Sequence, residues 1–268
     1  MSSIDRRSFL SLGGGAAALG LLPLAGCGGG GGDDEMPSVA VADAEAPMRA
    51  STSGPQFRAV ARTHSLAITG TDGRLRRYGG VGKTQGKLNF PAGVVVINGL
   101  AYVLETGNHR VQVFDSSGAS RKLIGEGELL YPNGIAAGLN EILVSDSGHS
   151  RIVGFSLDGR ITRVLGAGAL SAPRGLTVLG SNVLVADPGL RKVLLLGASG
   201  RVQGELGSGW VLPWDVATDG KYAYVADASR NEIAVVALSG RRIGSIPLNF
   251  APANVAFRNG TVVATPQV

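Results

Sequence analysis

Short apolar runs separated by polar turns follow one another along most of the chain. The segment 132–166 shows the pattern most clearly. Its short apolar runs, separated by turn signals, predict four strands at about 134–138, 142–146, 151–156 and 161–165. Turn pairs that end in glycine stand between the third and fourth strands and suit the positive φ of tight hairpins. The five pairs are Asp72-Gly73, Ser117-Gly118, Asp158-Gly159, Ser199-Gly200 and Ser239-Gly240.

The same pattern returns about every forty residues. A proline opens each copy, with spacings of 41, 41, 40 and 39 residues between Pro91, Pro132, Pro173, Pro213 and Pro252. Four antiparallel strands with this period are typical of a β-propeller blade, whose apolar faces are buried by neighbouring blades. The sequence therefore predicts an all-β propeller.

The order of the landmarks predicts how the ring closes. The first hairpin precedes the first proline, and the last proline follows the last hairpin. Residues 253–265 are therefore expected to supply the two inner strands of a composite blade and residues 57–80 its two outer strands. This gives five four-stranded blades closed by pairing of the N- and C-terminal strands. A sixth blade would need about forty more residues, although residues 55–63 leave room for one extra strand.

Composition limits the other possibilities. The chain is 44% apolar and 17% charged, which indicates a globular protein, and its 42 glycines fit many short strands and turns. A single cysteine among 268 residues excludes an internal disulfide framework and a cysteine-based zinc cluster.

The N-terminal segment has the features of an export signal. Arg6 and Arg7 precede a Gly/Ala-rich apolar stretch, which resembles a twin-arginine signal peptide, and the residues Leu-Ala-Gly-Cys at 24–27 resemble the lipobox of bacterial lipoproteins. The resemblance implies cleavage after residue 26 and lipidation of Cys27. It also implies a protein anchored in the envelope and facing the periplasm. The outer membrane is favoured because position 28 is not aspartate, and the general secretory route stays an alternative.

Charge divides the chain at the same places. Residues 1–26 carry a net charge of +1 and residues 27–54 carry −4. Because the whole chain carries +5, residues 55–268 carry +8. The glycine-rich, acidic segment 27–54 is expected to be a flexible tether, and 55–268 the propeller domain. Behind an export signal, a basic domain points to an envelope protein or an anionic glycan as partner rather than to nucleic acid.

Two repeats also resemble a known family. The segments FPAGVVVINGLAYVLETGNHRVQVFDSSG and YPNGIAAGLNEILVSDSGHSRIVGFSLDG are similar to NHL repeats, in which P-x-G-I/V precedes V-x-D-x-x-N-x-R-I/V. The resemblance covers about residues 57–265 and implies the propeller fold. It is weak evidence for a function, because the family includes binding modules, RNA readers and a few enzymes.

One acidic residue ends the second strand of each complete blade. These are Glu105, Asp146, Asp187 and Asp227, followed five residues later by Arg110, Arg151, Lys192 and Glu232. Paired carboxylates can serve acid–base chemistry or hold a metal. A residue that recurs in every blade is expected instead to serve the blade, through turn hydrogen bonds and ion pairs.

An enzyme of the gluconolactonase or peptide-amidating lyase type is the alternative reading. The first type binds a divalent metal through Asn or Asp before the blade-opening glycine, where this chain has Ala92, Asn133, Arg174, Trp214 and Ala253. Only Asn133 fits, and His109 and His149 would be the other candidate ligands. They and His64 are expected to be loop residues instead. We therefore expect no cofactor, no bound metal and no catalytic residue.

A binding surface is the preferred prediction. First-strand starts and the loops between second and third strands emerge on one face of a propeller. The residues expected there are Tyr131, Arg174, Arg191, Trp210, Trp214 and Arg230. Aromatic rings beside guanidinium groups are typical of protein hot spots and sugar platforms. Packing of Trp210 between blades is an equal alternative. The sequence thus predicts an exported, lipid-anchored NHL-like propeller that binds a protein or a ligand.

Overall fold

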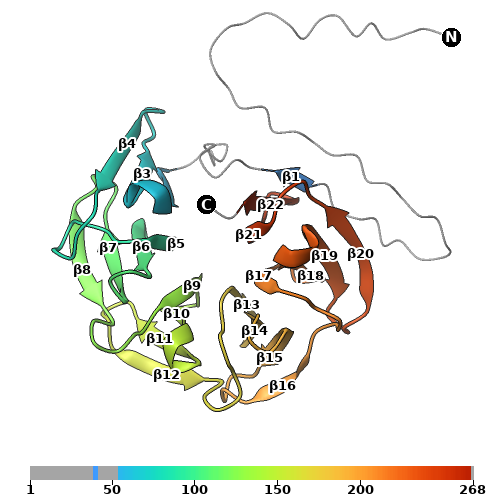
Figure 1. The fold of residues 1–268 in the computed structure, drawn as a ribbon. Coiled ribbons are helices and arrows are strands. Elements are labelled where there is room, and N and C mark those ends of the chain that lie inside the picture. The colour runs from blue at the N-terminus through green and yellow to red at the C-terminus, as the bar shows by residue number, and fades with distance from the viewer. Residues whose placement is uncertain (1–38, 42–53, 267–268) are drawn as a thin grey trace, which may run out of the picture.

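Six β-sheets surround a central space (Figure 1). The computed structural model describes residues 39–41 and 54–266. In this part of the chain no helix is long and apolar enough to cross a membrane, and the helices are single 3₁₀ turns. These turns are η1 (Ala61–Thr63), η2 (Ser147–His149) and η3 (Ala228–Arg230). Cys27, Arg6 and Arg7 lie outside the described residues, so the lipidation site and the export signal stay predictions.

Four of the sheets have four strands, each ordered along the chain. The first two contain β5 (Pro91–Ile97), β6 (Leu100–Glu105), β7 (Arg110–Phe114) and β8 (Ser120–Ile124), then β9 (Pro132–Ala137), β10 (Glu141–Asp146), β11 (Arg151–Ser156) and β12 (Ile161–Leu165). The next two contain β13 (Leu176–Leu179), β14 (Asn182–Asp187), β15 (Lys192–Leu196) and β16 (Val202–Glu205), then β17 (Pro213–Thr218), β18 (Tyr222–Asp227), β19 (Glu232–Ala237) and β20 (Arg242–Pro247). The predicted four-stranded repeat is confirmed in these sheets.

The two end sheets have three strands each. One contains β2 (Gln56–Val60), β3 (Ser65–Thr69) and β4 (Leu75–Gly79), and the other contains β21 (Pro252–Arg258), β22 (Thr261–Pro266) and β1 (Val39–Val41). β1 pairs with β22 in parallel, whereas every other pair of named strands is antiparallel. These three residues lie in the segment predicted as a tether, so this part of it belongs to a sheet.

The predicted composite blade is wrong. Two strands were expected in residues 57–80, but β2, β3 and β4 make three. β2 also ends at a 3₁₀ turn, as the second strands β10 and β18 do. β22 also follows its inner strand directly and therefore takes a second-strand position. Because two second strands cannot occupy one place in a sheet, the chain ends form separate sheets, and the count of five blades is not confirmed.

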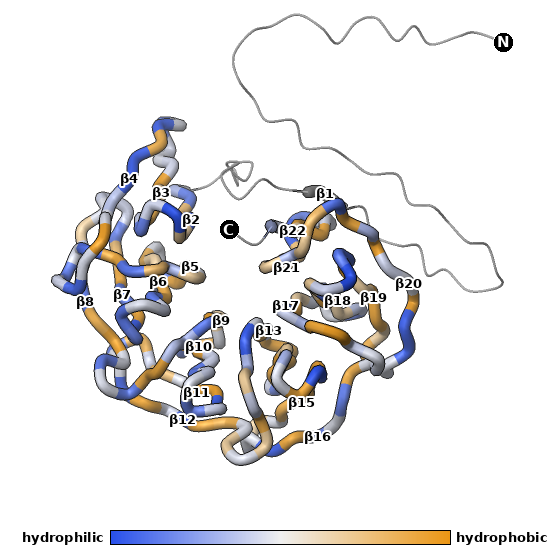
Figure 2. Tube along the Cα trace, viewed as in Figure 1, coloured by the Kyte–Doolittle hydropathy of each residue, from blue (hydrophilic) through white to orange (hydrophobic). Residues whose placement is uncertain are grey.

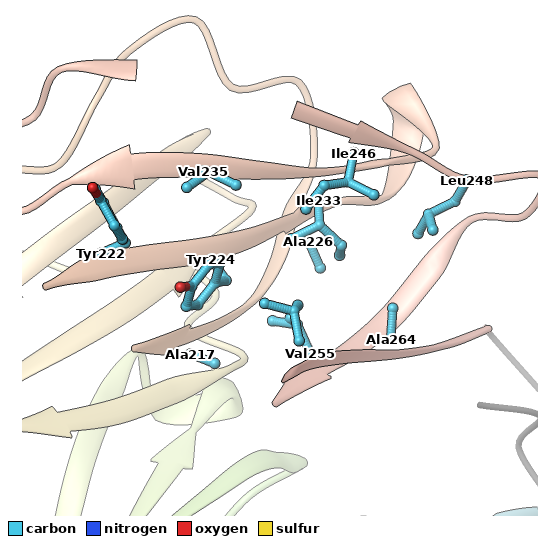
Figure 3. Close-up of a cluster of buried hydrophobic side chains, with 11 residues drawn as sticks. Ala217, Tyr222, Tyr224, Ala226, Ile233, Val235, Ile246, Leu248, Val255 and Ala264 are labelled. Atoms are coloured by element: carbon cyan, nitrogen blue, oxygen red, sulfur yellow. The ribbon is translucent and has the colours of Figure 1, made fainter. Parts of the chain in front are cut away.

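Apolar clusters fill the spaces between neighbouring sheets. Figure 2 colours the chain by hydropathy and shows hydrophobic residues recurring along the strands. Side chains such as Leu66 with Phe114, and Val144 with Val153, are fully buried in these clusters because the middle strands are covered on both faces. Figure 3 shows the cluster in which Tyr224 and Ile233 pack against Val255. The inner strands touch in the order β2, β5, β9, β13, β17 and β21.

The ring has one open seam. The described residues form five buried clusters for six sheets, and none of the five joins the sheet of β21 and β22 to that of β2, β3 and β4. Figure 1 shows the two end sheets facing each other across this gap. Among residues 54–266, each end sheet therefore shares a buried apolar cluster with one neighbouring sheet only.

Buried carboxylates tie each complete blade to the loop that leads into it. Asp187 is fully buried and accepts N–H hydrogen bonds from Ser171 and Ala172 at 2.8 and 3.0 Å, and from Leu190 at 3.1 Å. Asp227 accepts the same kind of bond from Val211 and Leu212. The predicted structural role of the acidic column is confirmed.

The other two members of the column add ion pairs. Glu105 accepts the Asn89 N–H and pairs with Arg110 Nε at 2.7 Å, and both side chains are buried. Asp146 accepts the Leu130 N–H and pairs with Arg151 at 2.8 Å. Each carboxylate satisfies amide groups that irregular loop backbone would otherwise leave buried and unpaired.

Asp187→Ala should destabilise the protein strongly. The substitution removes a fully buried carboxylate and leaves three backbone N–H groups without their acceptor, at about 1 kcal/mol or more for each, so a loss of about 3 kcal/mol is expected. Urea unfolding at pH 7 measures it. Asp158→Ala is the control, because that carboxylate lies on an exposed hairpin, and its effect should stay within about 0.5 kcal/mol. Equal losses in the two variants would contradict the role assigned to the column.

Candidate functional site

A cavity of about 790 Å³ runs along the inner strands. All six inner strands contribute to its wall, from Arg58 on β2 to Arg258 at the end of β21. The five prolines mark one end of the ring, because each first strand starts where its second strand ends, as in the pair Pro132 and Asp146. We call this end the proline face. The cavity volume is in the range typical of small-molecule sites.

Arg174 and Trp214 form a stacked pair where the cavity meets the proline face. The Arg174 guanidinium carbon lies 3.5 Å from the centre of the Trp214 ring, and both residues line the cavity. Burial lowers the pKa of Arg174, because a charged guanidinium loses hydration there. Stacking on the ring offsets part of that cost. The sequence placed both residues together on this face, and the structure brings them into contact.

The backbone around this pair is fixed by contacts between sheets. Ser145 donates its hydroxyl to the Arg174 carbonyl at 2.5 Å. The Gly175 N–H donates to the Trp214 carbonyl at 3.1 Å. Blades on either side thus hold the backbone of both residues, which gives the pair a fixed position.

Asp215 is a cavity residue that the sequence analysis missed. It stands where the other complete repeats have glycine, at positions 93, 134 and 175. Its carboxylate accepts N–H bonds from Val216 at 2.8 Å and from Val255 at 2.9 Å on the next sheet. A Cβ on Gly175 would come within 1.8 Å of Asp215 Oδ1, so the neighbouring glycine makes room for the acid. The replacement of the repeat glycine by Asp215 was the feature of the sequence that could have marked this residue as a site candidate.

The environment of Asp215 changes its ionisation. Burial raises the pKa of the carboxyl to about 7, and the two N–H hydrogen bonds limit the rise. No ion pair reaches it among the described residues. A carboxyl poised near neutral pH in a cavity is a candidate acid or base.

Trp210 is not a surface residue. Its side chain is 6% exposed, packs in the cluster with Val216 and Val236, and donates its indole N–H to the Leu206 carbonyl at 3.1 Å. The prediction that Trp210 contributes to a binding surface is therefore wrong, and packing between blades is correct. The apolar loop before Pro213 is held inward because Asp227 binds its amide groups.

Tyr131, Arg191 and Arg230 lie on the proline face but outside the cavity wall. Tyr131 is 58% exposed, and Arg191 and Arg230 are exposed as well. Arg230 donates to the Gly209 carbonyl at 2.9 Å and lies 3.8 Å from Asp227. These side chains can form a rim around the Arg174–Trp214 pair.

The histidines take part in contacts between blades. The Phe90 N–H donates to His64 Nδ1 at 3.0 Å, and the Tyr131 N–H donates to His109 Nδ1 at 2.8 Å. In both pairs the two rings pack edge to face. Since Nδ1 accepts a hydrogen bond, Nε2 carries the proton in the neutral ring.

The alternative metal ligands do not converge. His149 pairs with Asp146 at 2.8 Å, and Asn133 donates its amide to the Tyr131 carbonyl and to Ser147 Oγ. Among the described residues, no three His, Cys, Asp or Glu side chains lie together as a metal site would require. Asn133 lines the cavity, whereas His109 and His149 do not.

Known proteins support the fold. The family model for the NHL repeat matches residues 88–114 and 129–155. Virginiamycin B lyase from Staphylococcus aureus has a TM-score of 0.63 at 17% identity, over 78% of this chain and 72% of the lyase. A chain of the nidogen/laminin complex has a TM-score of 0.64 at 18% identity, over 80% and 85%. No curated protein is significantly similar in sequence. At these identities the structural likeness shows a propeller-type fold and no activity.

The pKa of Asp215 predicts a pH-dependent stability. The folded value of about 7 lies above the ordinary value of 3.8, so the folded protein holds a proton that the unfolded chain has lost. Stability should therefore be greatest below about pH 4 for this group and fall as pH rises to 7, by at most about 1.4 kcal/mol per pH unit.

Urea unfolding of the wild type and of Asp215→Asn at pH 5, 6, 7 and 8 isolates this effect. The difference in the free energy of unfolding between them should change in favour of the variant as pH rises, and level off above pH 7. A difference that stays constant with pH would show that Asp215 ionises normally.

Proposed function

We propose that the chain is an exported, lipid-anchored propeller that binds a ligand or partner of the bacterial envelope at the cavity mouth. The Arg174–Trp214 stack carries the proposal, because it presents an aromatic ring and a guanidinium group at the opening of a large cavity. Such pairs are enriched where proteins bind partners or sugars. The exposed side chains of Tyr131 and Arg191 on the same face extend this surface.

Export and anchoring rest on the sequence. The lipobox at 24–27 and the arginine pair support a periplasmic location, with the outer membrane favoured. A basic propeller in that compartment would meet envelope proteins and anionic glycans. The nidogen/laminin structure offers a precedent for a similar fold in a protein complex.

Trp214→Ala and Arg174→Ala should each weaken binding at this surface. Loss of the ring or of the cation is expected to lower capture by tenfold or more, which is the usual effect of a hot-spot residue. A photo-crosslinking amino acid at position 131, in protein expressed in its own envelope, measures capture in each background. Arg160→Ala is the matched control, because Arg160 is exposed on a hairpin turn. Undiminished crosslinking in both test variants would contradict the proposal.

An enzyme is the second candidate function. The observation in its favour is Asp215, a cavity carboxyl whose pKa of about 7 suits proton transfer. The likeness to virginiamycin B lyase shows the fold only. A lyase or lactonase with a metal would need ligands beyond Asn133, and the described histidines are engaged elsewhere.

Metal content tests the metal-dependent form of the second candidate. Protein purified without chelators should contain well under one divalent ion per chain by elemental mass spectrometry, because no ligand cluster is present in the described residues. Asn133→Ala serves as the control preparation. One tightly held ion per wild-type chain, lost in Asn133→Ala, would favour the metal-dependent enzyme instead.

A further inference from the structure

The charged side chains that line the cavity are almost all positive. Four arginines and a single acid contribute to the wall, namely Arg58, Arg62, Arg174, Arg258 and Asp215. They come from different sides of the ring. Arg58 and Arg62 belong to the first sheet, Arg174 lies before β13 three inner strands further on, and Arg258 ends β21. The wall is therefore basic around much of its circumference.

Three of these arginines have no acceptor of their own. Arg62, Arg174 and Arg258 make no ion pair and no side-chain hydrogen bond to any described residue. By contrast, at least eight arginines elsewhere lie within 4.0 Å of a carboxylate: Arg76, Arg110, Arg121, Arg151, Arg160, Arg163, Arg230 and Arg242. Many arginines outside the cavity are thus paired, whereas Arg62, Arg174 and Arg258 in its wall have no carboxylate partner among the described residues.

Leaving Arg174 without an acceptor has a cost, because it is half-buried and burial lowers its pKa. Arg62 and Arg258 are exposed, although partial desolvation lowers the pKa of Arg258 as well. Asp215 forms no ion pair with any of them, and its two oxygens accept backbone N–H groups. An anion in the cavity would supply the missing acceptors, and hydrogen bonds between guanidinium and oxyanion are among the strongest in proteins.

The positions of the arginines describe a ligand with two acidic ends. Arg62 and Arg174 lie near the proline face. Arg258 is the last residue of β21, which starts at Pro252 on the proline face, so Arg258 lies near the opposite face of the ring. Between these ends the wall is largely apolar, with Val94, Ile135, Leu176, Val178, Val216 and Val255. A chain of methylene groups or a ring would bury apolar surface there, while its acidic ends meet arginines.

We infer that the central cavity binds a small organic dicarboxylate, with one carboxylate group at each end of an apolar body. Arg174 holds one acidic end beside Trp214, and Arg258 holds the other. The inference rests on the proposed function, since it names the ligand class of the same site. It assigns a role to Arg258, which the surface around Trp214 does not include.

Linear dicarboxylates of four to ten carbons are the probes. Their affinity for the purified wild-type protein is measured by isothermal titration calorimetry at constant ionic strength, beside monocarboxylates of the same length and inorganic phosphate. One chain length should bind best, at least tenfold more tightly than the matching monocarboxylate. Arg174→Gln and Arg258→Gln should each remove this advantage, and Arg160→Gln should keep it.

Asp215→Asn provides an independent test in the opposite direction. It removes the only acid of the described wall, so at pH 8 the variant should bind the best dicarboxylate severalfold more tightly than the wild type. A damaged fold cannot produce such a gain. Arg258→Lys, which keeps the charge, should retain part of the affinity lost in Arg258→Gln and so show that a loss is electrostatic.

Several results would overturn the inference. These are absence of binding to any dicarboxylate, equal affinity for mono- and dicarboxylates, binding of phosphate alone, or an equal loss in Arg160→Gln. If crosslinking at position 131 still depends on Trp214 in that case, the proposed function stands without the di-acid. If dicarboxylates bind as expected but crosslinking is independent of Trp214, the inferred cavity ligand is supported and the proposed envelope partner is contradicted.

Discussion

Buried carboxylates hold the loops from which the inner strands start. An irregular loop has amide groups that no strand partner satisfies, and these amides point at a carboxylate that is fully buried. Asp187 and Asp227 satisfy two adjacent amides each, and Glu105 and Asp146 satisfy one each while holding an arginine. Each first strand, which follows such a loop, therefore starts at a fixed position along the axis of the ring. The positions of Arg174 and Trp214 follow from this arrangement.

The polar and aromatic side chains of the candidate site stand at positions where the sequence departs from the repeat. Most first strands follow P-x-G, and the variable residue is alanine or asparagine in the neighbouring blades. Blade-opening positions 174 and 214 instead carry a guanidinium group and an indole ring, and position 215 carries a carboxyl where glycine is usual. Each departure faces the cavity. The regular positions build the scaffold, and the exceptions give its centre a distinct character.

Much of the scaffold could be predicted because its causes are local. Alternating apolar residues, glycine turns and the recurring acid each act within one repeat, and the strands of the four complete sheets fall near their predicted places. Ring closure depends on which strands meet across more than 170 residues, and β2 carried no proline or acid to mark it as a second strand. The burial of Trp210 and the altered ionisation of Asp215 depend likewise on neighbouring sheets, so composition alone could not reveal them.

The seam between the first and last sheets differs from the other contacts between sheets. Among residues 54–266, each of these two sheets shares a buried apolar cluster with one neighbour only. Arg58 and Arg258 stand on the inner strands of these two sheets, and like charges repel across a gap. Dissolved ions screen that repulsion over about 10 Å at 0.1 M salt. The repulsion between the first and last sheets is therefore strongest at low ionic strength.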